Sequence, residues 1–108
     1  MTRCTAMRKA FADIRWISYS EGGRKTLPQL GAMYYPHILV DQITESQSWS
    51  VCFLITPVSH DSISRITFSM LIENEETSRF FSKLCVGMEF KLLEGDTIVA
   101  IGQIKGII

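Results

Sequence analysis

The sequence predicts a single all-β domain with one short helical insertion. Apolar and polar residues alternate in several segments, which is the two-residue period of a strand with one buried face. Glycine, proline and aspartate separate these segments, as they do between short strands. About six short strands with one helical insert favour a closed barrel or a sandwich.

The first part of the chain contains two extended segments. An N-terminal arm, residues 1–9, precedes a strand over Ala12–Trp16 in which every second residue is apolar. Glu21–Arg24 has the composition of a turn. A second extended run covers Gly31–Asp41 and contains Pro36, which has no N–H to donate and therefore marks an edge or a bulge.

The middle of the chain contains two strands and then a helix. Trp49–Ile55 and Arg65–Ile72 alternate in hydropathy, with a loop over Pro57–Ser64 between them. Asn74 can cap a helix that ends by Gly87, and two glutamates follow the cap, where the helix dipole favours negative charge. The residues at helical spacing are Phe80, Phe81, Leu84 and Cys85. This helix is the expected insertion.

The chain closes with a predicted hairpin. Met88–Leu92 alternates, Glu94–Asp96 is a short loop, and Thr97–Ile108 is a last strand whose two apolar faces indicate a central position. Residues 10–108 are therefore expected to form one domain. The predicted core is Ile14, Trp16, Val51, Phe53, Ile66, Phe68, Met70, Phe90, Leu92 and Ile104.

Composition restricts the classes of function. The chain has 108 residues, of which 46% are hydrophobic and 20% charged, so an ordered single domain is expected. Eleven basic and eleven acidic residues give zero net charge, which disfavours a strong general attraction to nucleic acid or anionic membrane. No segment has the roughly 20 apolar residues of a spanning helix, and the arm does not resemble a signal peptide. A cytoplasmic location is expected.

The cysteines and histidines do not suggest a metal centre or catalysis. Cys4, Cys52 and Cys85 form no Cys-x-x-Cys pair, and we expect the last two to be buried and Cys4 exposed. No histidine and cysteine cluster has metal-ligand spacing, so no metal or cofactor is predicted. His60-Asp61-Ser62 contains the residue types of a hydrolytic triad, but neighbours in an extended chain point apart, so a surface loop is expected. No catalytic residue is predicted.

Two stretches carry a resemblance to a known family. Phe11 to Thr26, which contains Glu-Gly-Gly-Arg-Lys-Thr, is followed by Tyr34-Tyr35-Pro36 and resembles the opening of the third domain of elongation factor Tu. Gly87 to Ile104, with Glu-Gly at its centre, is similar to the closing hairpin of that domain. The two stretches bracket the chain, and the middle matches weakly.

The resemblance implies a six-stranded antiparallel barrel that acts as a stand-alone copy of this domain. In the family, the domain contacts the GTPase domain, the T-stem of aminoacyl-tRNA and the exchange factor. Carried over by position, the candidate RNA contacts are Gly22, Gly23, Arg24, Lys25 and Thr26. The partners implied are tRNA or a translation-related protein.

The chain also departs from the family pattern. Tyr35 stands where the family has arginine, Asp96 replaces a glycine, and the Asn74–Leu84 helix is not part of the family barrel. No Gly-x-x-x-x-Gly-Lys-Ser/Thr loop is present, so no nucleotide binding or GTPase activity is expected.

Each candidate site has an alternative interpretation. Gly22 and Gly23 either let backbone approach a phosphate or supply the positive φ of a tight turn. Tyr34 and Tyr35 are candidate protein contacts beside a strand edge, although at least one is expected in the core. The basic residues of the first quarter form either one patch or a scattered surface, and they are Arg8, Lys9, Arg15, Arg24 and Lys25.

The functional expectation is a non-enzymatic binding module. Its ligand is expected to be tRNA, another RNA or a translation-related protein. The alternative is a structural or protein-interaction barrel without a nucleic-acid role, either oligomerising or acting as an inhibitor or immunity protein.

Overall fold

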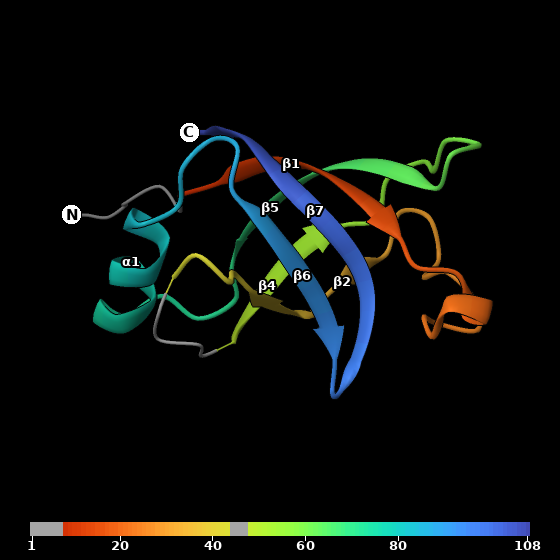
Figure 1. The fold of residues 1–108 in the computed structure, drawn as a ribbon. Coiled ribbons are helices and arrows are strands. Elements are labelled where there is room, and N and C mark those ends of the chain that lie inside the picture. Colours follow the sequence, from red (N-terminus) through yellow and green to blue (C-terminus); the bar gives the residue numbers. More distant parts are fainter. Residues whose placement is uncertain (1–7, 44–47) are drawn as a thin grey trace.

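The computed structural model describes residues 8–43 and 48–108 and shows a closed six-stranded antiparallel β-barrel with one short helix (Figure 1). Its elements are β1 (Ala10–Trp16), the 3-10 helix η1 (Tyr19–Glu21), β2 (Met33–Tyr34), β3 (His37–Leu39), β4 (Trp49–Leu54), β5 (Ile63–Met70), α1 (Glu75–Ser82), β6 (Glu89–Glu94) and β7 (Thr97–Ile107). The predicted all-β barrel is confirmed. The expected N-terminal arm lies mostly outside the described residues.

The barrel closes because each of six strands pairs with two neighbours. The strand order is β4, β3, β6, β7, β1 and β5, and β5 pairs back onto β4. The first and last strands are neighbours, with Ala10 opposite Ile107. Across the described residues, β2 pairs only with β4, so it is an accessory strand at the rim of the barrel.

The core consists of the residues that the alternating pattern assigns to it. Every predicted core residue is 4% exposed or less. Phe68 lies at the centre, with its ring centroid 5.8 Å from that of Phe90 and 6.5 Å from that of Phe81. Gly102 allows this packing, since a Cβ there would lie 2.4 Å from the Phe90 ring. The local alternation therefore determines which side chains of a strand face the core, and aromatic contacts hold them there.

Helix α1 covers the end of the barrel opposite η1 (Figure 1). Asn74 caps it as predicted: its Oδ1 accepts a hydrogen bond from the Thr77 amide at 2.9 Å. Phe80 contacts Trp49, with ring centroids 6.0 Å apart, and Phe81 contacts the core. The helix ends at Ser82, with Lys83 as its C-cap. This end lies about one turn before the end expected near Gly87.

Three expectations made from the sequence are wrong, two of them at element ends. Cys85 is exposed because it follows the end of α1, where no helical face is left to direct it inward. Ile72 is 61% exposed because β5 ends at Met70. Cys52 points outward from β4 and is only half-buried. Cys4 lies outside the described residues.

Pro36 divides the predicted run Gly31–Asp41 into two strands. It lies between β2 and β3, is fully buried, and accepts a hydrogen bond through its carbonyl from the Val51 amide at 3.0 Å. The sequence predicts an edge or a bulge at this proline. The register with β4 is the same on both sides of Pro36, so it is not a bulge, and β2 before it pairs with β4 alone in the described structure. β3 continues into the barrel between β4 and β6, while β2 stays at the rim.

Candidate partner-binding surface

The connection between β1 and β2 forms the end of the barrel that carries η1. Gly22 has φ = 100° and ends η1, a conformation that costs other residues about 1–2 kcal/mol. Gly23 donates from its amide to the Ser18 carbonyl at 2.9 Å, and a Cβ at Gly23 would lie 2.0 Å from the Ile17 carbonyl oxygen. Gly22 therefore supplies the positive φ that the conformational interpretation expected, whereas Gly23 has no positive φ and serves the close approach to Ile17.

Arg24 turns toward the barrel and pairs with a carboxylate. Its Nη1 contacts Glu94 Oε2 at the end of β6, and the Tyr34 hydroxyl donates to the same oxygen. Arg24 Nε donates to the Thr26 carbonyl at 2.8 Å, and the guanidinium carbon lies 5.7 Å from the centroid of the Tyr34 ring. We name Arg24, Tyr34 and Glu94 the mouth cluster.

The electrostatics of the mouth cluster are those of a closed, neutralised pair. Burial and the hydrogen bond to Glu94 raise the pKa of the Tyr34 phenol, so this group stays protonated. Partial burial opposes the charge on Arg24, but bonding to Glu94 outweighs it and the pKa of the guanidinium rises. A phosphate near Arg24 would have to compete with the Glu94 carboxylate for its charge. The cation expected to contact RNA is therefore already bound within the protein.

The other residues of the predicted loop remain open to solvent. Lys25 and Thr26 are exposed and line a hollow together with Gly23, Arg24, Glu94 and Thr97. Lys25 makes no ion pair within the two described stretches. A phosphate near this loop would thus meet one free cation.

The basic residues of the first quarter contact different partners. Arg8 lies over the Phe81 ring at 4.9 Å, and Arg15 lies 3.8 Å from Glu21. Arg24 belongs to the mouth cluster. The scattered arrangement, rather than a single basic patch, is what the structure shows.

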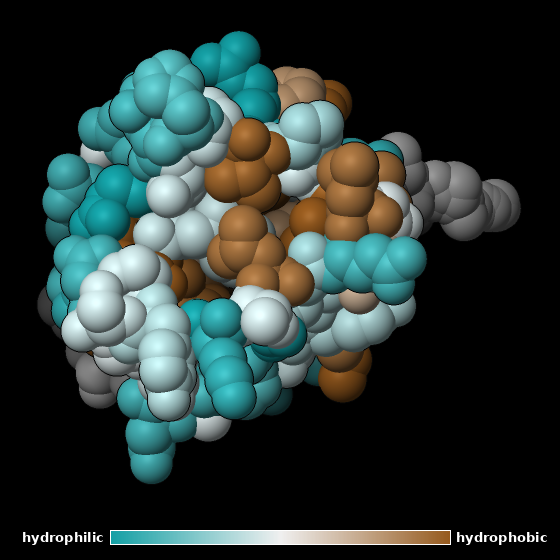
Figure 2. Space-filling view, turned by 90° about the vertical axis from the view of Figure 1, so that its right-hand side faces the viewer, coloured by the Kyte–Doolittle hydropathy of each residue, from teal (hydrophilic) through white to brown (hydrophobic). Residues whose placement is uncertain are grey.

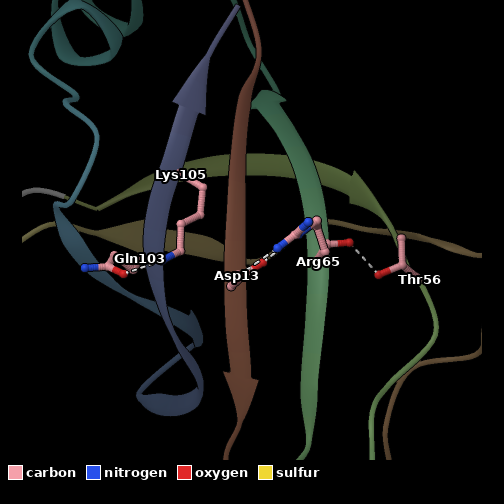
Figure 3. Close-up of polar contacts among 5 residues, drawn as sticks. All are labelled: Asp13, Thr56, Arg65, Gln103 and Lys105. Carbon is pink, nitrogen blue, oxygen red and sulfur yellow. Dashed lines mark hydrogen bonds and ion pairs between the residues drawn. The ribbon is translucent and has the colours of Figure 1, made fainter.

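The outer face of β5, β1 and β7 carries a row of polar contacts (Figure 3), beside Ile63 and Ile101, which are 41% and 39% exposed on either side of Arg15. Arg65 Nε donates to Asp13 Oδ1 at 3.0 Å, and Lys105 Nζ donates to Gln103 Oε1 at 2.8 Å. The hydrogen bond from Arg65 lowers the pKa of Asp13. This ladder is typical of a solvated strand surface and leaves no concentration of one charge.

The surface over β2 and β4 is apolar instead. Met33 and Leu54 are paired across the two strands and are 48% and 50% exposed. Tyr35 is 55% exposed, and Leu30, in the turn before β2, is 63% exposed. We name Leu30, Met33, Tyr35 and Leu54 the β2–β4 patch. Figure 2 shows that apolar side chains also gather in the middle of the η1 end of the barrel.

The two adjacent tyrosines have different environments. Tyr34 points into the barrel, with its ring centroid 5.9 Å from Trp16 and 5.6 Å from Phe53. Tyr35 points outward, since side chains alternate along an extended chain. One tyrosine thus packs against the core and the other is available to a partner.

The remaining candidates contribute no further site. His60 and Asp61 lie in an exposed loop, with His60 Nε2 3.5 Å from Asp61 Oδ1, as a surface loop predicts. Over residues 8–43 and 48–108, no three histidine, cysteine, aspartate or glutamate residues are grouped to hold a metal ion. No helix among these residues is long and apolar enough to cross a membrane.

Sequence reasoning missed two members of this surface. The local pattern predicts only a short loop at Glu94, and nothing in it indicates a partner 70 positions away. The alternation of Trp49–Ile55 predicts that Leu54 faces solvent, and a large apolar residue at such a position is itself a signal of an exposed apolar surface.

No known protein family matches the chain, and no curated protein matches it. The resemblance to the third domain of elongation factor Tu stays a prediction.

Proposed function

We propose that this barrel is a non-enzymatic module that binds another protein through the β2–β4 patch. The observation that carries the proposal is the cross-strand pair Met33–Leu54, two large apolar side chains each about half exposed on the outer face. Contiguous exposed apolar side chains are typical of protein contact sites, where their burial supplies the binding free energy.

RNA binding is the weaker alternative. Lys25 is the one free cation of the predicted loop in the described structure, because Arg24 pairs with Glu94. A single phosphate contact gives a salt slope of only about −0.7 to −0.9 on a log–log plot, so binding would be weak. The resemblance to a translation factor domain makes a translation-related protein the first class of partner to examine.

The test compares capture by three forms of the tagged protein in an extract of the cells that make it. The forms are the parent, the double variant Met33→Ser/Leu54→Ser, and Lys25→Ala as the loop control, each checked for folding by circular dichroism. Mass spectrometry and RNA sequencing identify what is retained. The proposal expects a stoichiometric protein that survives high salt, is retained by Lys25→Ala and is lost from the double variant.

The opposite pattern overturns the proposal. RNA that binds the parent and the double variant equally, and is lost from Lys25→Ala or at moderate salt, would assign the loop instead of the patch. If all three forms retain the same molecules in equal amounts, neither the β2–β4 patch nor the Lys25 loop is the binding site.

A further inference from the structure

A hollow of about 450 Å³ lies at the end of the barrel that α1 covers (Figure 1). It opens between the residues just before β1, the end of β5 and the inner side of α1. Its volume falls within the roughly 300–1,000 Å³ of sites for small molecules and exceeds what a single inorganic ion fills. We name it the α1 hollow; its rim is formed by Arg8, Glu73, Asn74 and Ser78, and its floor by Met70 and Phe81.

The floor of the α1 hollow is apolar and is held in place by the core. Met70 and Phe81 are both buried, and the Phe81 ring packs against Phe68, with ring centroids 6.5 Å apart. Arg8 lies over the Phe81 ring, with its guanidinium carbon 4.9 Å from the ring centroid. This cation–π contact sets a guanidinium beside a fixed apolar surface. A molecule in the hollow therefore meets hydrocarbon and a cation together.

The rim carries two opposite charges without partners in the described structure. Arg8 and Glu73 are both exposed, and neither forms an ion pair with the other or with any residue of 8–43 and 48–108. The planar fork of a guanidinium matches a carboxylate, and a carboxylate accepts hydrogen bonds from an ammonium group. A ligand that carries both groups satisfies both charges, whereas a simple anion or cation leaves one of them opposed.

Two uncharged polar groups of the rim match the same ligand. Asn74 Oδ1 accepts from the Thr77 amide at 2.9 Å, so the helix cap fixes the plane of the Asn74 amide. Neither its Nδ2 nor the Ser78 hydroxyl makes a hydrogen bond within the described part of the chain. The nitrogen can donate to a carboxylate, and the hydroxyl can accept from an ammonium group.

We propose that the α1 hollow binds a small zwitterion of the α-amino acid class with a large apolar side chain. Arg8 binds the carboxylate and Glu73 binds the ammonium group. The apolar side chain of the ligand covers the floor, where its burial adds to the binding free energy. This site goes beyond the proposed function, because no residue of the β2–β4 patch lines it.

The test is a titration of the whole chain with leucine, methionine and phenylalanine, followed by NMR of the backbone amides. Saturable shifts are expected at Asn74, Thr77 and Ser78 with at least one of the three. Two analogues of leucine separate its charges, since N-acetyl-leucine lacks the ammonium group and leucinamide lacks the carboxylate. Each is expected to bind at least about tenfold more weakly than the matching amino acid, because one charged contact is lost.

Variants of the two charged residues assign each ligand group to its partner. Arg8→Gln should weaken binding of the amino acid at least about tenfold and leave the weak binding of leucinamide unchanged. Glu73→Gln should weaken it similarly and leave N-acetyl-leucine unchanged. Glu76→Gln makes the same change at an exposed residue of α1 outside the hollow, so this matched control should bind like the parent. Circular dichroism checks that each variant is folded.

Three outcomes overturn the proposal. Absence of saturable shifts with all three amino acids excludes this ligand class. N-acetyl-leucine that binds as tightly as leucine makes the hollow an anion site in which Glu73 has no role. Unchanged binding in both Arg8→Gln and Glu73→Gln places the ligand elsewhere on the protein. None of these results bears on capture of a protein by the β2–β4 patch, so the two proposals fail separately.

Discussion

Arg24 and Glu94 lie 70 positions apart in the chain and form one ion pair at the mouth of the barrel. Tyr34 donates to the same carboxylate oxygen, so the pair joins the β1–β2 connection, the rim strand β2 and the β6–β7 hairpin. Arg24, which the sequence suggested as a ligand contact, therefore helps to hold three segments of the barrel together.

Replacing Arg24 is expected to lower stability more than replacing its neighbour. Arg24→Ala removes a partly buried ion pair and leaves Glu94 without its cation, at a cost of about 1 kcal/mol. Lys25→Ala, the matched control at an exposed site, should change the free energy of unfolding by no more than about 0.5 kcal/mol. Urea denaturation measures both. Equal midpoints for the two variants would show that the ion pair does not stabilise the fold.

Tyr34 is expected to make stability fall at alkaline pH. Its pKa is raised in the folded state, so the fold holds a proton that the unfolded chain releases near pH 10. Its contribution is complete below that pH and declines as the pH rises above it. In urea denaturation between about pH 9 and pH 11, the parent should lose more stability than Tyr34→Phe.

Ultraviolet titration of the phenolate provides the control for this prediction. Tyr34, whose pKa is raised by burial and by Glu94, should ionise late, and Tyr34→Phe should remove the late transition. A parent and a Tyr34→Phe variant with the same alkaline profile would contradict the burial of this phenol.

The barrel core is expected to depend on Phe68. Phe68→Ala removes a ring that is 1% exposed and contacts Phe81 and Phe90, at a cost of about 3–5 kcal/mol. Phe11→Ala makes the same chemical change at a residue that is 39% exposed and should cost clearly less. Thermal unfolding compares the two. Similar losses would contradict the assignment of the strand faces.

The two glycines of the turn are expected to differ. Gly23→Ala places a Cβ against the Ile17 backbone oxygen, which cannot move without displacing the end of β1. Gly22→Ala meets open space, and its cost is the left-handed backbone alone, about 1–2 kcal/mol. Denaturant unfolding should therefore rank Gly23→Ala as the more destabilising. The reverse order would mean that the turn relaxes around residue 23.

Local patterns were sufficient to predict most of the fold. Alternation correctly predicted that Ile14 and Phe68 lie in the core. Successive side chains of a strand point to opposite faces, so the face of each residue follows from its position in the alternating pattern. The Asn74 cap and the turn at Gly95 could also be predicted from the sequence, because both depend on a few neighbouring residues. Beyond the end of an element, as at Cys85 after α1, neither strand alternation nor helical spacing predicts which way a side chain points.

The candidate surface was less accessible to sequence reasoning, because long-range register creates it. Arg24 looks like a free cation until the register of β6 brings Glu94 beside it. Likewise, Met33 becomes half of an exposed pair only through the alignment of β2 with Leu54. Neither alignment is encoded within a single segment of the chain.

The pairing of β1 with β7 has a consequence for the timing of folding. Ala10 lies opposite Ile107, and the Ile108 amide donates to the Lys9 carbonyl at 2.9 Å. A nascent chain therefore cannot close the barrel until Thr97–Ile107 of β7 has left the ribosome, and contacts of such sequence separation form slowly. Until then, β1 and β6 each expose an unpaired edge. The growing polypeptide is most exposed to proteases and to aggregation in the interval just before synthesis of this barrel is complete.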